Sequence, residues 1–207
     1  MKVVIITVPM KRHDQIEPVQ YPVDGNRAIE YEKSVRCPVN GVLAKTMKKD
    51  EQVRVIYIMT RGTHSECEQN RKNFTDELEK INAEIGAVLS YDTVEIDFLP
   101  TKQTYNKLLT DLTEKIPENA EIFTDITFGF KPEILSLFCA LRFVEEFRDA
   151  IVQYIVYGKA EFNKEGQIEH PVLFDITSLY YLFKLIGNIE NADFETASKM
   201  LKDFFAL

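Results

Sequence analysis

The chain has 207 residues, 45% of them hydrophobic and 11% aromatic, so it is long enough to bury a core and is not a disordered segment. Its formal net charge of −8 argues against duplex nucleic acid as a partner, because proteins that bind duplexes usually present a basic face to the phosphates. Three cysteines without CxxC spacing argue against a disulfide framework or a zinc site and favour a reducing, cytoplasmic setting.

Membrane association is not expected from the apolar runs. The first run, residues 3–8, is followed at once by Pro9, Lys11 and Arg12, which makes it too short for a signal peptide. No later run approaches the roughly eighteen apolar residues of a membrane span. We therefore interpret the first run as a buried strand.

Hydrophobic periodicity predicts the following elements in chain order. The first half contains a strand at 3–8, a β-hairpin over 17–35 with its turn at 24–26, a short helix at 41–48, a strand at 53–60 and a long polar helix at 65–87. The second half contains a strand at 92–98, a helix at 103–116, a strand at 121–126, an apolar helix at 132–147, a strand at 151–157, a hairpin at 158–174 with its tip at 164–166, and helices at 177–187 and 193–206.

Strand and helix alternate four times, which is typical of parallel βαβ units. The predicted fold is α/β: a doubly wound, mainly parallel, Rossmann-like sheet with helices on both faces, β-hairpin insertions and a C-terminal helical pair. We expect residues 1–175 to form a ligand-binding domain. Residues 176–207 are expected to be helices that pack on it or lead to an absent effector domain.

Ligands of such sheets lie beyond the carboxyl ends of the strands, where the strand order reverses. Hydroxyl groups, cations and glycines gather after three of the predicted strands, which suits a phosphate-bearing ligand. Phe128 and Phe130 could stack on a base, although either could simply close the core. Asp125 could be only a helix cap, and the basic side chains could be solvated loop charges. The candidate ligand-binding residues are Thr7, Pro9, Met10, Lys11, Thr60, Arg61, Gly62, Thr63, Asp125, Thr127, Phe128, Gly129, Phe130 and Lys131.

Several common sites have no motif in this chain. GxGxxG, the P-loop, HExxH and GxSxG are all missing, and no cysteine and histidine stand at metal-ligand spacing. The many carboxylates lie mainly along predicted helix faces, as solvated charges do. We expect neither a cofactor nor a metal.

The run DITFGFKPEILSLFCALRFVEEF at residues 125–147 resembles the signature of CRISPR-associated Rossmann-fold domains, an Asp-hydrophobic-Thr-His-Gly-Phe-Arg loop leading into a long apolar helix. Asp125, Thr127, Gly129 and Phe130 match this signature. Phe128 replaces the histidine, and Lys131 replaces the arginine, which keeps the charge but loses the bidentate fork. The resemblance also covers VIITVP, VRVIYIMT, IVQYIVYG and PVLFDITSLYYLFKL, and so most of the chain.

This resemblance implies a sensor in type III CRISPR antiviral signalling that binds cyclic tetra- or hexa-adenylate across a homodimer interface, with the tetra-adenylate favoured. A cyclic ligand of even symmetry fits a twofold dimer that presents the same loops twice. It further implies an effector domain, fused or separate. A transcription regulator that senses the same ligand is disfavoured by the acidic charge and by the lack of a DNA-binding domain.

The alternative is a stand-alone, metal-independent ring nuclease, in which a ribose 2′-OH attacks the adjacent phosphate to leave a 2′,3′-cyclic phosphate. Such an enzyme needs only to align the attack and to stabilise the developing charge. Lys11, Arg61 and Lys131 are the candidate charge-stabilising groups, and His13 or His64 is the candidate base. Because Phe128 replaces the signature histidine, binding is the favoured function.

Overall fold

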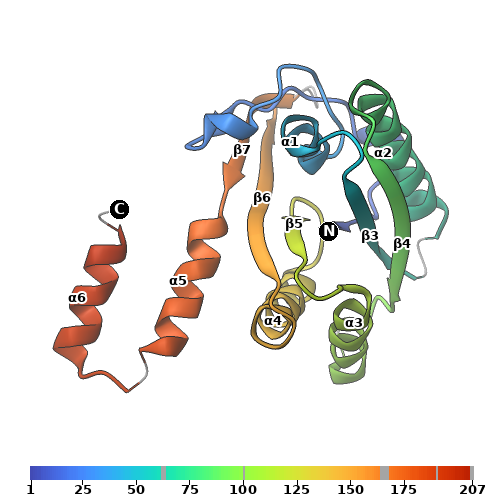
Figure 1. The fold of residues 1–207 in the computed structure, drawn as a ribbon. Helices are drawn as coiled ribbons and strands as arrows, with labels where there is room; N and C mark the ends of the chain where they lie inside the picture. The colour runs from blue at the N-terminus through green and yellow to red at the C-terminus, as the bar shows by residue number, and fades with distance from the viewer. Residues whose placement is uncertain (62–63, 100, 164–167, 190, 206–207) are drawn as a thin grey trace.

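The computed structural model describes residues 1–61, 64–99, 101–163, 168–189 and 191–205 (Figure 1). The strands are β1 (Lys2–Thr7), β2 (Val23–Asp24), β3 (Gln52–Thr60), β4 (Val88–Ile96), β5 (Glu121–Asp125), β6 (Ile151–Phe162) and β7 (Ile168–Asp175). The helices are α1 (Pro38–Thr46), α2 (His64–Ile85), α3 (Lys102–Lys115), α4 (Lys131–Phe147), α5 (Thr177–Asn188) and α6 (Phe194–Phe205), with short 3₁₀ turns η1 (His13–Gln15) and η2 (Arg27–Ile29).

The described strands form one seven-stranded sheet in the order β2-β7-β6-β5-β1-β3-β4. Neighbouring strands run parallel throughout, except for the antiparallel pair β6 and β7. After β1 the chain forms β2 at the far edge, comes back to pair β3 with β1, moves outward to β4, and then returns to β5 on the other side of β1. The strand order therefore reverses between β1 and β5, and the predicted doubly wound, mainly parallel sheet is confirmed.

Two buried clusters lie on opposite faces of the sheet, because successive side chains of a strand point to opposite sides. Val4 and Ile6 of β1 belong to the cluster that α1 and α2 cover, whereas Val3 and Ile5 belong to the cluster that α3 and α4 cover (Figure 1). All four side chains are fully buried. This explains why the first strand is an unbroken apolar run, and it confirms helices on both faces.

The first predicted hairpin is reduced to a single antiparallel bridge between Val19 and Val35. Between these two residues the chain forms β2, which pairs with β7, and then η2, where the Asn26 side chain accepts a hydrogen bond from the Ala28 N–H. The turn residues therefore start a 3₁₀ turn and do not join two paired strands. The second predicted hairpin is confirmed in β6 and β7, and its predicted tip at 164–166 lies outside the described residues.

The third predicted strand begins at Val88 and not at residue 92. Gly86 ends α2 in a positive-φ conformation (φ 84°), and its N–H donates to the carbonyl of Asn82. Such a glycine cap lets the strand start two residues later. Val88–Ser90 therefore extend the pairing of β4 with β3. The sequence did not predict this, because these three residues do not alternate between apolar and polar.

The C-terminal helical pair is present as predicted. Tyr180 anchors α5, because its buried ring packs on Phe138 of α4 and its hydroxyl donates to Glu145 at 2.6 Å. Neither buried cluster includes a described residue of α6, and Figure 1 shows α6 beyond α5, away from the sheet. Within the described part of the chain, no helix combines the length and the apolar character that crossing a membrane requires.

Candidate functional site

A cavity of about 280 Å³ lies beyond the carboxyl ends of β1, β3 and β5, at the point where the strand order reverses. Three segments that are distant in the sequence enclose it: the loop after β1, the last residue of β3, and the loop from β5 into α4. This is the position at which an open parallel sheet binds ligands. Its lining residues are Val8, Pro9, Met10, Lys11, Thr60, Thr127, Phe128, Gly129, Phe130 and Glu133.

Eight of the residues predicted from sequence meet in this cavity: Pro9, Met10, Lys11, Thr60, Thr127, Phe128, Gly129 and Phe130. They combine one cationic side chain, two hydroxyl groups and two aromatic rings. The first turn of α4 begins directly after them, and such a turn leaves backbone N–H groups without acceptors inside the helix. The cavity therefore offers an anion both charge and hydrogen-bond donors.

Asp125 and Thr7 do not line the cavity and are buried, with 1% exposure each. The Asp125 carboxylate accepts hydrogen bonds from the N–H groups of Val39 at 2.9 Å and Thr127 at 2.8 Å, and from the Cys37 thiol at 3.8 Å. Burial raises the pKa of this carboxyl group. Asp125 thus joins the end of β5 to the start of α1, so it is a helix cap, but of α1 and not of the helix that follows it.

Arg61, Lys131 and His13 do not line the cavity. Arg61 forms ion pairs with Glu95 at 2.9 Å and Asp97 at 3.8 Å, and Lys131 is exposed at the start of α4. The His13 ring is bonded to Glu66 at 3.0 Å and does not line the cavity. Gly62 and Thr63 lie outside the described residues, and of His64 only the place at the start of α2 is described.

The loop after β1 is held from α2 by Asn70. The amide nitrogen of this fully buried side chain donates to the carbonyl oxygens of Pro9 at 2.9 Å and Lys11 at 2.8 Å. Its amide oxygen is buried without a partner. Asn70 therefore fixes the backbone beside the Lys11 side chain, a role that no local sequence pattern indicates.

The loop after β5 is fixed at both ends. The Thr127 hydroxyl accepts a hydrogen bond from the Gly158 N–H at 2.8 Å. Gly129 has a φ of 139°, and a Cβ atom there would come within 3.2 Å of the Thr7 side chain. Only glycine adopts this conformation readily, so the signature glycine is explained by backbone shape and by close packing.

The two phenylalanines of the loop have different neighbours. Phe128 stacks on Phe74 at 6.0 Å between ring centroids and packs against the cluster under α1 and α2. Phe130 meets Phe98 edge to face at 5.1 Å. Both are half-buried and both line the cavity, so each ring contributes to packing and also faces the space where a base could lie.

Glu133 is not among the residues predicted from sequence, because it resembles the other carboxylates along predicted helix faces. It is 3% exposed, lines the cavity and accepts a long hydrogen bond of 3.4 Å from the Phe130 N–H. Burial raises its pKa to about 7. The available signal was its position: the third residue of a helix returns its side chain towards the preceding loop.

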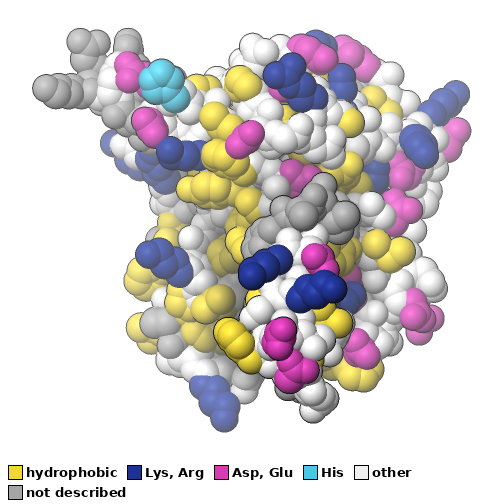
Figure 2. Space-filling model, turned by 90° about the vertical axis from the view of Figure 1, so that its left-hand side faces the viewer, with side chains coloured by type: hydrophobic (Ala, Val, Ile, Leu, Met, Phe, Trp, Pro, Cys, Tyr) yellow, Lys and Arg dark blue, Asp and Glu magenta, His cyan; other side chains and the backbone are white. Residues whose placement is uncertain are grey.

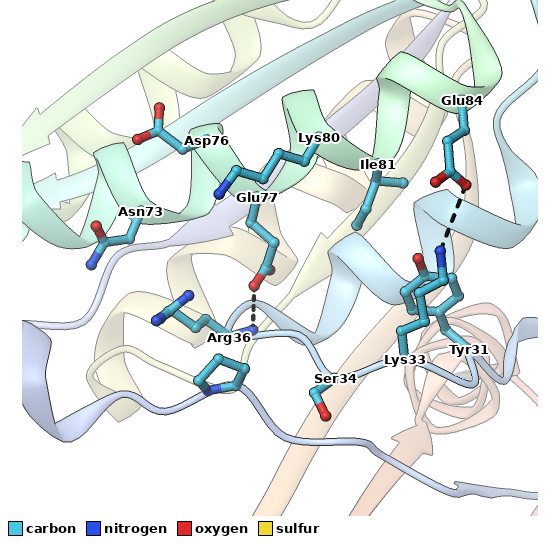
Figure 3. A pocket seen from close by; sticks show the side chains of 11 residues that line it. Tyr31, Lys33, Ser34, Arg36, Asn73, Asp76, Glu77, Lys80, Ile81 and Glu84 are labelled. Carbon is cyan, nitrogen blue, oxygen red and sulfur yellow. Dashed lines mark hydrogen bonds and ion pairs between the residues drawn. The ribbon is translucent and has the colours of Figure 1, made fainter.

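A second hollow of about 400 Å³ lies between α2 and residues 31–36 (Figure 3). Figure 3 shows Glu77 directed at the Arg36 backbone, and an ion pair between Lys33 and Glu84. Glu77 also accepts hydrogen bonds from the Cys37 N–H and the Asn40 side chain. Cations and carboxylates alternate around the hollow, and Glu77 is already hydrogen-bonded. The hollow therefore favours neither an anionic nor a cationic ligand.

No family model matches the chain, and no curated protein matches it. Among solved structures, it is similar to Enterococcus italicus Csm6 bound to cyclic hexa-2'-fluoro-hexa-dAMP, with 15% sequence identity and a TM-score of 0.38. The match covers 99% of this chain and 49% of that chain, so the chain spans about half the length of the Csm6 chain. A likeness this distant assigns neither a family nor a function to the chain. The candidate site is therefore argued from the chain's own residues.

Proposed function

We propose that the chain binds a cyclic oligoadenylate in the cavity at the ends of β1, β3 and β5, and that it acts as a sensor of this ligand in type III CRISPR antiviral signalling. The observation that carries the proposal is the convergence of Lys11, Thr60, Thr127 and the start of α4 at the strand-order reversal. The resemblance of residues 125–147 to the signature of CRISPR-associated Rossmann-fold domains supports the choice of ligand.

The phosphates and the bases of such a ring make different demands. Lys11, the two threonine hydroxyls and the first turn of α4 suit the phosphates, because they supply a positive charge and hydrogen-bond donors. Phe130 suits a base, since stacking on an aromatic ring is worth roughly 1–3 kcal/mol per base. A protomer's cavity of about 280 Å³ is small for a whole ring, so the ligand extends beyond it.

That extension favours a homodimer in which two cavities share one ring. We assign the dimer contact to the outward faces of α4 and α5, which we call the α4/α5 face. It carries six apolar side chains that are 43 to 69% exposed: Leu135, Phe143 and Phe147 on α4, and Leu179, Phe183 and Ile186 on α5. Because α4 starts at the cavity, a second copy on this face brings both cavities near one twofold axis.

Binding is favoured over cleavage by the places of the catalytic candidates that are described. His13 is bonded to Glu66 outside the cavity, and Arg61 is paired with two carboxylates. Of the predicted catalytic candidates that are described, Lys11 alone lines the cavity. A lysine can hold a phosphate without cutting the ring.

Calorimetry with cyclic tri-, tetra- and hexa-adenylate, in EDTA, tests the proposal. We expect sub-micromolar affinity for the tetra-adenylate, one ring per dimer, and an intact ring by chromatography after prolonged incubation. Lys11→Ala should weaken binding by at least about tenfold, because it removes the cavity's cation. Lys107→Ala on the exposed face of α3 is the matched control and should bind normally. Absence of heat with all three rings, for folded protein, would refute the function.

A further inference from the structure

Among the described residues that line the cavity, Glu133 is the one with a carboxyl group. Most of the hydrogen-bonding capacity of this group is unused. Among the described residues, the Phe130 N–H is the one hydrogen-bond donor that reaches it, at 3.4 Å. Asp125, buried to the same extent, accepts hydrogen bonds from two N–H groups and a thiol. Buried polar groups normally find partners, so an under-bonded carboxyl group in a cavity indicates a ligand-facing role.

Few charged groups surround Glu133. Lys11, from the loop after β1, lines the same cavity, and Lys131 precedes Glu133 on α4. Tyr105 of α3 is close enough that burial and the Glu133 charge both raise its pKa. No ion pair with Glu133 forms within the described ranges. The remaining lining residues of the cavity are uncharged, so they add no positive charge that would favour the ionised form of Glu133.

The protonation state of Glu133 changes the charge of the cavity. With Glu133 ionised, a negative charge lies in the same cavity as Lys11. With Glu133 neutral, that negative charge is absent, which favours a ligand rich in phosphate. Since burial raises its pKa to about 7, the neutral form is accessible near neutral pH.

A neutral carboxylic acid presents one O–H donor beside one carbonyl acceptor. This is the pattern with which asparagine and glutamine pair to adenine, where N6 donates and N7 accepts. Guanine presents two acceptors on the same edge, N7 and O6, so the neutral acid cannot satisfy both. A carboxylate has no donor and cannot pair with adenine in this way.

We propose that Glu133 recognises the adenine edge of the bound nucleotide, and that it does so as a neutral carboxylic acid. This rests on the proposed function and adds the residue that selects the base. The phosphates of the ligand reinforce the neutral form, because they disfavour a second negative charge beside them. Binding therefore takes up a proton when it occurs above about pH 7.

The test measures the affinity for cyclic tetra-adenylate from about pH 5.5 to 8.5, in buffers of different ionisation enthalpy. We expect constant affinity at the acidic end and, above about pH 7, a fall of about tenfold per pH unit for each Glu133 engaged, with proton uptake on binding. Glu133→Gln keeps a donor and an acceptor without titrating. It should bind across the whole range with the affinity of the wild-type chain at low pH, and without proton uptake. Glu146→Gln, an exposed carboxylate change on the same helix, should keep the wild-type profile.

A measurement without ligand separates this assignment from the function itself. The folded pKa of Glu133, about 7, lies above its ordinary value of 4.5, so its stabilising contribution is complete below 4.5 and is lost as the pH rises to about 7. The melting temperature of Glu133→Gln should therefore exceed that of the wild-type chain increasingly from about pH 5 to 7.5. If this difference appears but no ring binds at any pH, the proposed function fails and adenine recognition falls with it.

Two results would overturn the assignment. Equal wild-type affinity across the pH range would do so and leave the proposed function intact. Cleavage of the ring at a rate that rises above pH 7 and disappears in Glu133→Gln would also do so, because Glu133 would then act as a base and not as a reader of adenine, and it would replace the proposed sensor by a ring nuclease.

Discussion

Asp125 ends β5 and Glu133 lies in the first turn of α4, and both are buried, yet their surroundings give them different roles. The Asp125 carboxylate is bonded to α1 and to its own loop, which makes it an anchor. Glu133 faces the cavity with one long hydrogen bond. The number of partners, and not the residue type or its burial, separates a structural carboxyl group from one available to a ligand.

Asp125→Ala should lower the free energy of unfolding by roughly 2–4 kcal/mol, because it leaves the buried N–H groups of Val39 and Thr127 without their acceptor. Asp125→Asn should lose less, since its amide oxygen can still accept one of these bonds. Lys131→Ala, at an exposed position in the same signature, should change stability by less than about 0.5 kcal/mol. Urea denaturation measures all three. Equal losses for Asp125→Ala and Lys131→Ala would contradict the anchoring role.

At this scale the sequence identified the loops but not the direction of every side chain. Residues of the three loops meet as predicted because the carboxyl ends of parallel strands share one edge. Arg61 turns to Glu95, and Asp125 turns to Val39, since those partners come from segments that lie far away in the sequence. Glu133 was missed because its burial depends on how α4 packs, which no local pattern contains.

The loop from β5 to α4 is the element that shapes the cavity, and its form depends on contacts with two strands. The Thr127 hydroxyl accepts from the Gly158 N–H of β6, and Gly129 lies against Thr7 of β1. The loop therefore cannot move away from the sheet without breaking a contact at each end. This gives a ligand a preformed surface.

Gly129→Ala should destabilise the fold by about 1–3 kcal/mol and weaken ligand binding, because alanine is strained at a φ of 139° and its Cβ meets Thr7 at 3.2 Å. Gly187→Ala in α5 is the matched control. Its Cβ would meet no atom within 4 Å, so it should stabilise the chain by up to about 1 kcal/mol. Thermal melts and calorimetry on both variants give the answer. A Gly129→Ala chain as stable as the wild type would show that the loop adapts.

Elements with their own strong pattern were predicted well, and weakly patterned ones were not. The apolar stripe of α2, from Phe74 to Ile85, and the apolar helix α4 form as expected. Residues 17–35 contain strand-like arms around a turn, but β2 pairs with β7 and not with its neighbour in sequence. Local propensity could not foresee that pairing, because the partner strand lies about 150 residues further along the chain.

At the scale of the whole molecule, the α4/α5 face is an exposed apolar surface. Figure 2 views the side that carries α5 and α6, where hydrophobic side chains gather beside the charged residues of these helices. The six side chains of the α4/α5 face expose on the order of 600 Å² of apolar area, judged from the usual size of such side chains. That approaches the ~800 Å² which each partner buries in a standard interface, and it lies at the upper end of the range for the largest patch on a typical monomer.

Phe143→Glu combined with Phe183→Glu should therefore convert the proposed dimer into a folded monomer, because it places four charges in one twofold interface. Sedimentation at about 10 μM measures the oligomeric state, and circular dichroism confirms the fold. Phe194→Glu, on α6 and 86% exposed, lies outside the α4/α5 face and should leave the dimer intact. A wild-type chain that sediments as a monomer up to about 100 μM would refute this interface.

The central position of β1 also governs the order in which the chain can fold during synthesis. β1 is made first and pairs with β3 on one edge, but its other edge stays open until β5 emerges. The first turn of α1 also lacks a hydrogen bond until then, because the acceptor of the Val39 N–H is Asp125, the last residue of β5. Throughout the synthesis of residues 61–120, the nascent chain therefore has an unpaired strand edge and a Val39 N–H without its acceptor. In this interval, pairing with other chains competes most strongly with folding, and a chaperone has the most to shield.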